Sequence, residues 1–162
     1  MGAKELQEKL QVFFRESMRI TVQYFKAKLI ISLILAVVAG GIFSLLDIPL
    51  YGLFGAIFGI SNLVPVFGSL IASIIICVVL LFIKPILALY VLFVILGLQI
   101  LEQFILTPLI MGKAMDLKPL VIIGVVMAAG IFAGFWGMLF ALPIAASIKI
   151  AYDIFVHNTP VK

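Results

Sequence analysis

The sequence contains very few of the residues that build catalytic or metal-binding sites. Among 162 residues there is one cysteine, Cys77, and one histidine, His157. A single cysteine excludes a disulfide within the chain, and we interpret Cys77 as an inert thiol in an apolar segment. A lone histidine without companion ligands does not make a zinc site. We therefore predict no metal and no cofactor.

Charged residues are also scarce. They make up 11% of the chain, whereas 65% is hydrophobic. Soluble domains are about 45–50% apolar and about 25% charged, so the composition predicts an integral membrane protein in a lipid bilayer. Seven acids, one histidine and no phosphate-binding glycine loop argue against an enzyme and against nucleotide-driven pumping. The net charge of +4 does not indicate nucleic-acid binding, because six of the eleven basic residues precede residue 29.

The apolar segments divide the chain into two predicted parts. Residues 1–28 are amphipathic and predict a cytoplasmic N-terminal helix, which could run on into the first span. Residues 29–162 predict a membrane transport domain, with spans or half-spans at 29–46, 50–60, 69–83, 86–112, 119–133 and 137–156. The basic residues before the first span, and two lysines in 113–118, place both termini in the cytoplasm of an inner (plasma) membrane.

Two of the apolar segments are interrupted in the middle. The first break carries Asn62, Pro65 and Gly68, and the second carries Gly134 and Gly137. Each arm beside the first break is shorter than the about 20 residues needed to cross a bilayer. This predicts a re-entrant helical hairpin, although two strongly tilted spans would also fit. Further helix breaks are expected at three prolines: Pro108, Pro119 and Pro143.

The two interrupted segments belong to a weak internal repeat. Each unit has a helix followed by a broken pair, and the second arms contain the similar stretches SLIASI and LPIAASI. One full span between them would make the first hairpin enter from outside and the second from inside. We predict an all-α polytopic membrane protein of two helix-plus-hairpin units, arranged as an inverted repeat of the kind that surrounds a transporter's central site.

Glu102 is the strongest candidate for a functional residue. It lies in the apolar run 86–112, and Gln99 and Gln103 share its helical face. An ionisable group at membrane depth disfavours insertion by about 2.5–3.5 kcal/mol and usually has a partner or a transport role. We predict a proton or cation carrier; a structural ion pair with Lys149, Lys84 or another subunit is the alternative. Gln99 and Gln103 could bind a polyol or a cation, or could join helices. Asn62 could bind a ligand or cap a helix.

These motifs, in this order, resemble the autoinducer-2 exporter (AI-2E) family. The resemblance rests on Asn62-Leu63-Val64-Pro65 with Gly68, on Gln99 and Glu102, on the run 107–112, and on Pro119-Leu120 leading to Gly134-Phe135-Trp136-Gly137 and Pro143. Family members are about twice as long, and this chain resembles their C-terminal half. Val66 and Ser69 stand where the family often has Tyr and Pro.

The resemblance implies export of autoinducer-2 or a similar small polar metabolite, by a homo-oligomer with no cofactor. We expect alternating access around Glu102 and the hairpin tips, with coupling to protons or sodium. A sodium/proton antiporter would need the same acid and no metabolite. A structural or assembly subunit without transport of its own is the third possibility.

Overall fold

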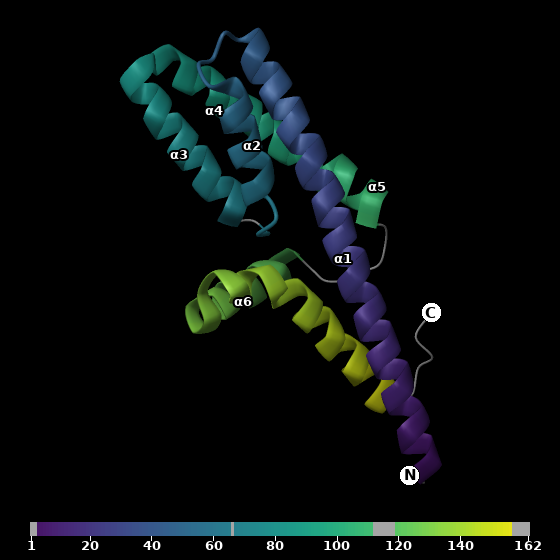
Figure 1. Cartoon of the computed structure of the whole chain (residues 1–162). Helices are drawn as coiled ribbons and strands as arrows, with labels where there is room; N and C mark the ends of the chain where they lie inside the picture. Colours follow the sequence, from purple (N-terminus) through teal and green to yellow (C-terminus); the bar gives the residue numbers. More distant parts are fainter. Residues whose placement is uncertain (1–2, 66, 112–118, 157–162) are drawn as a thin grey trace. The chain divides into compact units, whose positions relative to one another are not determined.

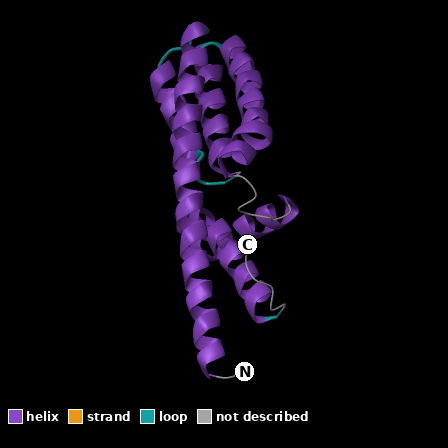
Figure 2. Ribbon diagram, turned by 90° about the vertical axis from the view of Figure 1, so that its right-hand side faces the viewer, coloured by secondary structure: helices purple, strands orange, loops and turns teal. Residues whose placement is uncertain are grey.

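The computed structural model describes residues 3–65, 67–111 and 119–156, and every element in these ranges is helical (Figures 1 and 2). The elements are α1 (Ala3–Leu45), α2 (Tyr51–Ser61), α3 (Phe67–Ile83), α4 (Pro85–Leu101), the π-helix η1 (Glu102–Leu106), α5 (Thr107–Met111) and α6 (Pro119–Phe155). The prediction of an all-α protein is confirmed. His157 and the loop 113–118 lie outside the described residues.

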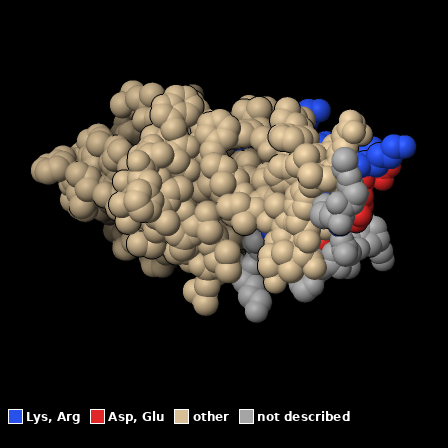
Figure 3. All heavy atoms as spheres, turned by 90° about the horizontal axis from the view of Figure 1, so that it is seen from below, with Lys and Arg blue, Asp and Glu red and all other residues tan. Residues whose placement is uncertain are grey.

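In the part of the chain that the structure describes, three helices are, by length and composition, long and apolar enough to cross a membrane. They are Lys4–Leu45, Pro85–Leu106 and Leu120–Phe155, whereas α2 and α3 are shorter apolar helices. Figure 3 shows a face on which most of the visible Lys, Arg, Asp and Glu atoms lie toward one side and most of the other described atoms belong to uncharged residues. Many large hydrophobic side chains are exposed. An apolar surface of this extent is suited to lipid. The chain is therefore a multi-pass membrane protein, as its composition predicted.

The chain divides into two compact units, one of residues 27–112 and one of residues 1–26 with 113–162. Helix α1 is a single helix of 43 residues that passes through both, with no break at residue 28. The amphipathic N-terminal segment thus runs on into the first span. Its uninterrupted backbone reflects the absence of proline from residues 1–45 and the lack of any polar turn sequence there.

The unit 27–112 is held together by apolar stripes on α1, α2, α3 and α4. On α1, buried residues recur every fourth position at Ile31, Leu35, Ala39 and Phe43. This spacing keeps them on one helix face. Buried residues of the other helices complete the same core: Phe54 and Phe58 on α2, Ala72, Ile76 and Leu80 on α3, and Leu87, Ala88, Val91, Ile95 and Leu98 on α4.

Helices α1 and α2 approach closely because glycines line their contact. A Cβ on Gly55 would lie 2.7 Å from the Cα of Gly40, and a Cβ on Gly59 would overlap the side chain of Ala36. Small residues four apart let helix backbones pack at short distance. The Gly55–Gly59 pair therefore determines how near the end of α2, where Asn62 lies, comes to α1.

In the other unit, α6 contains a sharp internal reversal. Ala133 and Gly134 have non-helical backbone angles, and Gly134 has φ +57°. Beyond the reversal the arms pack closely, because a Cβ on Gly137 would overlap the carbonyl of Ala129. The sequence also suggested a break at Pro143, but the helix continues through it. Proline's φ is compatible with a helix, and only one backbone hydrogen bond is removed there.

Candidate functional site

Glu102 lies where the helix of α4 changes from α to π geometry. The N–H of Glu102 still bonds to the carbonyls of Leu98 and Gln99, whereas its own carbonyl accepts from the N–H of Thr107, five residues on. Single π-helical turns inside α-helices are rare and often coincide with functional sites. The widened turn places the Glu102 side chain inside the unit 27–112, where the residue is 3% exposed.

The sequence contains a physical reason for the widened turn. Pro108 has no N–H, so the carbonyl of Phe104 cannot accept the ordinary α-helical bond from four residues on. The π-helical bond from the N–H of Thr107 to the carbonyl of Glu102 lies in the turn directly before this proline. The π-helix ends directly before α5, which contains Pro108, and the chain remains helical through Met111.

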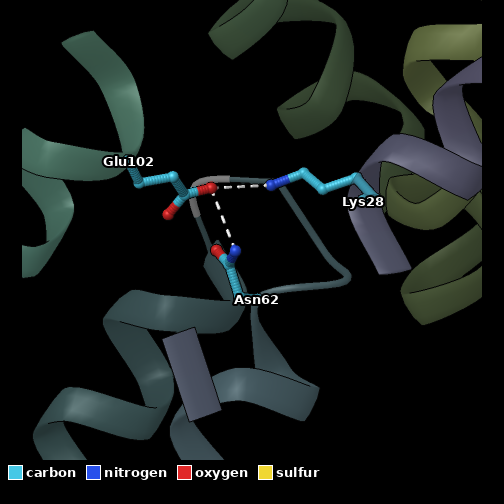
Figure 4. Close-up of polar contacts among 3 residues, drawn as sticks. All are labelled: Lys28, Asn62 and Glu102. Atoms are coloured by element: carbon cyan, nitrogen blue, oxygen red, sulfur yellow. Dashed lines mark hydrogen bonds and ion pairs between the residues drawn. The ribbon is translucent and has the colours of Figure 1, made fainter. Parts of the chain in front are cut away.

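The carboxylate of Glu102 pairs with Lys28 of α1 (Figure 4). The Lys28 Nζ lies 2.9 Å from Oε1 of Glu102, and the two residues are 7% and 3% exposed. A buried charge is strongly unfavourable unless it is paired and hydrogen-bonded. Each charge therefore compensates the other, across 74 positions of sequence.

Asn62 completes the cluster from the tip between α2 and α3. Its Nδ2 donates to the same Oε1 at 2.9 Å, and the residue is 1% exposed. Asn62 is the C-cap residue of α2, and its backbone N–H bonds to the carbonyls of Phe58 and Gly59. The side chain is therefore held on a turn whose backbone is already fixed.

The tip itself is compact. Pro65 is buried, and the N–H of Gly68 bonds to the carbonyl of Val64 at 3.1 Å. A Cβ on Gly68 would overlap the carbonyl oxygen of Ser61. Only glycine lets α3 begin this close to the end of α2, so Gly68 determines where Asn62 is placed.

The cluster retains unused hydrogen-bonding capacity. Both donors converge on Oε1, and no donor among the described residues reaches Oε2. The ammonium of Lys28 has three hydrogens and the amide of Asn62 has a free acceptor oxygen. A polar ligand or an ion could therefore bind without first displacing every existing contact.

The other expected site residues lie elsewhere. Gln99 is half-buried and Gln103 is exposed, and within the described part of the chain neither bonds to Glu102. Adjacent residues of a helix do not face the same way, and here Glu102 points inward while Gln103 is exposed. Gly134 and Gly137 belong to the other unit, and Pro119 is the first residue of α6.

The sequence analysis missed Lys28. The expected partners of Glu102 were Lys149 and Lys84, but the structure pairs it with Lys28. Lys28 had been counted among the basic residues that flank the first span. A useful signal was present: Lys28 shares a helical face with Ile31, Leu35 and Ala39, which predicts a buried side chain.

Replacing Asn62 with alanine is expected to destabilise the unit by about 1.5–3 kcal/mol, because a hydrogen bond to a charged group is lost inside the protein. Unfolding titrated with SDS in mixed micelles would measure the change. Gln103→Ala is the matched control, since Gln103 is exposed and removes no bond to Glu102. Equal stability of the two variants would contradict a bond between Asn62 and Glu102.

Comparisons with known proteins agree on one family. The AI-2E family transporter profile matches residues 2–157. YrrI of Bacillus subtilis (strain 168), described as a candidate transport protein, is 33% identical over 127 residues, which are 78% of this chain and 36% of YrrI. YueF of the same organism, with the same description, is 29% identical over 126 residues, 78% of this chain and 34% of YueF.

A shorter match with higher identity is to PerM of Escherichia coli (strain K12), described as a candidate permease. It is 45% identical over 51 residues, which are 32% of this chain and 14% of PerM. The chain spans about a third of the length of YrrI and YueF. The resemblance drawn from the motifs is confirmed at the level of the family.

Proposed function

Because the chain belongs to the AI-2E family of transporters, we propose that it forms a membrane transport unit for a small polar metabolite such as autoinducer-2. In this proposal the metabolite is exported through the inner membrane, with both termini in the cytoplasm. Glu102 couples export to a gradient of protons or sodium ions.

The observation that carries the proposal is the buried polar cluster around Glu102. It joins α1, the tip after α2, and the π-helical turn after α4. Ionisable groups inside membrane helices mark ion and substrate pathways more often than they serve packing alone. An unfilled carboxylate oxygen and a free amide oxygen suit a polyol or an ion as ligand.

The hairpin of α2 and α3 supports a gating role for its tip. Asn62 bonds directly to Glu102. A change in the charge or position of the carboxylate would therefore act on the tip through one hydrogen bond. Interrupted helices of this kind carry the binding sites of many secondary transporters. We propose that Pro65 and Gly68 keep this tip rigid, and that Gly134 and Gly137 do the same at the reversal in α6.

A sodium/proton antiporter is the second candidate. It is favoured by the charge of the cluster, since Glu102 is its only acid and one carboxylate can exchange one proton for one sodium ion.

A third candidate is an assembly subunit without transport of its own. It would fit a purely structural role of the buried and neutral Lys28–Glu102 pair. Assembly as a homo-oligomer would enlarge the small unit in any of these roles.

Reconstitution in liposomes tests these candidates. We expect wild-type protein to move autoinducer-2 in a way that depends on an imposed proton or sodium gradient. Glu102→Gln, which keeps the size of the side chain and removes its charge, is expected to lower gradient-driven flux at least tenfold. A pH-sensitive dye inside the liposomes reports proton movement in parallel.

Gln103→Ala is the control, because it changes an exposed polar residue beside Glu102. Unchanged flux and pH dependence in Glu102→Gln would contradict the coupling role. Sodium–proton exchange without metabolite would favour the antiporter. No flux of either kind from folded wild-type protein would favour the assembly subunit.

A further inference from the structure

The ammonium of Lys28 occupies a position that also suits a bound metal cation. It lies 2.9 Å from Oε1 of Glu102, in a site where all three side chains are at least nine-tenths buried. We propose that Glu102 and Asn62 form a binding site for a monovalent cation, and that Lys28 is a tethered competitor that fills this site when no ion is bound. The inference rests on the proposed coupling role of Glu102 and names its ligand class and its regulation.

The charge of the cluster limits the ligand to a single positive charge. With Lys28 in place, one carboxylate faces one ammonium, so the pair is neutral. Within the ranges that the structure describes, no group of three acids, histidines or cysteines could hold a multivalent metal. Removing the ammonium leaves one buried negative charge, which one monovalent ion compensates. The ammonium and the ion are therefore mutually exclusive.

The neighbouring groups supply oxygen ligands. Glu102 contributes two carboxylate oxygens, of which Oε1 is used in the pair with Lys28. Rotation of the Asn62 amide would bring its oxygen to the position where Nδ2 now donates. Carboxylate and carbonyl oxygens are the ligands that hard cations prefer. Asn62 can thus face either partner: its nitrogen toward the carboxylate, or its oxygen toward an ion.

Ser32 provides an independent indication of a ligand here. It follows Lys28 by one helical turn on the same face of α1 and is 6% exposed. Its hydroxyl has no hydrogen-bond partner among the described residues. A Cβ on Gly59 would lie 2.5 Å from the Ser32 carbonyl oxygen, so the backbone of α1 at Ser32 lies close to α2, three residues before Asn62. A cation between α1 and the tip would give this hydroxyl a partner.

The chemistry of lysine suits a competitor. The ammonium is a compact point charge on a flexible stem of four carbons, so it can leave the carboxylate without movement of the backbone. Lys28 also lies near the basic end of the apolar part of α1, and long lysine stems reach toward polar surroundings from such positions. The same lysine can therefore close the site or withdraw from it.

The test measures unfolding of purified protein in detergent, at one pH well above the ordinary titration of glutamate. Sodium chloride is compared with N-methyl-D-glucamine chloride at equal ionic strength. Lys28→Met is expected to unfold at a temperature that rises with each tenfold increase in sodium, because a ligand stabilises the state that binds it. Wild-type protein and Lys28→Arg, which keep the competing positive charge, are expected to show a smaller rise that begins at a higher sodium concentration.

Two controls isolate the site. Lys26→Met removes an exposed lysine two residues earlier and should behave as wild type. Lys28→Met with Glu102→Gln lacks the carboxylate and should lose the response to sodium. Lys28→Gln is a second test variant, because its amide can still donate to Glu102 and keep the protein folded.

The proposal would be overturned if Lys28→Met and Lys28→Gln fold and their unfolding temperatures do not change with sodium concentration. Failure of both to fold at any sodium concentration would also overturn it, since Lys28 would then be an obligatory structural partner. Folding of either variant only with sodium present would support it. Absence of flux in the wild-type protein would contradict the proposed transport. It would not affect the sodium dependence of the unfolding temperature, which is measured separately. Flux with sodium-insensitive Lys28 variants would contradict only the competitor role.

Discussion

A Glu102→Lys chain is expected to lose most of its folded population, and adding Lys28→Glu is expected to restore a large part of it. The single change places two ammonium groups where a buried ion pair lies, at a separation of 2.9 Å in the native protein. Breaking a buried pair by changing one partner destabilises by about 3–5 kcal/mol, because a buried charge is left uncompensated. This is a large fraction of the about 5–15 kcal/mol that stabilises a typical domain.

The exchanged pair should recover stability because Asn62 can face either charge. Its nitrogen now donates to the carboxylate, and after rotation its oxygen can accept from a lysine at position 102. Size-exclusion profiles in detergent and SDS titrations would compare the two variants with Lys28→Glu alone. Lys4→Glu, at an exposed position of the same helix, controls for charge reversal in general. Equal losses in the single and exchanged variants would contradict direct pairing.

Gly68→Ala is expected to separate α3 from the end of α2 and to release Asn62 from Glu102. The added Cβ would overlap the carbonyl oxygen of Ser61, and a backbone group cannot move aside as a flexible side chain can. Overpacking of a close contact costs about 1–3 kcal/mol, to which loss of the Asn62 bond would add. We expect both lower stability in SDS titrations and weaker gradient-driven flux.

Gly52→Ala is the matched control because Gly52 belongs to the same hairpin. Nothing lies within 4 Å of a Cβ placed there, and the residue is exposed. Alanine in a helix is more favourable than glycine by about 0.5–1 kcal/mol, so this variant should be as stable as wild type or slightly more so. If Gly68→Ala matched Gly52→Ala in stability and flux, the close contact with Ser61 would not determine the position of Asn62.

The long-range pairing of Lys28 with Glu102 could not be read from periodicity. Helical spacing places Glu102 on one face of its helix, but it does not say which helix that face meets. Gln99 and Gln103 were grouped with Glu102 by the spacing of a regular α-helix. Neighbouring residues of a helix lie about 100° apart, and in the structure Gln103 is exposed while Glu102 is buried. A helix break was predicted at Pro108, whereas the chain passes there from the π-helix η1 into α5.

The sequence by itself determined the class of protein and the nature of its elements. Its apolar fraction is far above that of soluble proteins, and its apolar segments are long enough for membrane helices, with glycine and proline at the interruptions. It also identified Glu102 as exceptional, because a charge in an apolar run is energetically unfavourable in any fold. These conclusions depend only on local composition.

The tertiary structure decided what surrounds that charge. Close packing at Gly55 and Gly59 determines how α2 approaches α1, and Gly68 determines how α3 leaves the tip. Together these contacts bring Lys28 and Asn62 to one carboxylate oxygen, from positions 74 and 40 residues away in the sequence. Such distances follow from how whole helices cross, to which every residue of the interface contributes, so the partners of Glu102 could be known only from the folded chain.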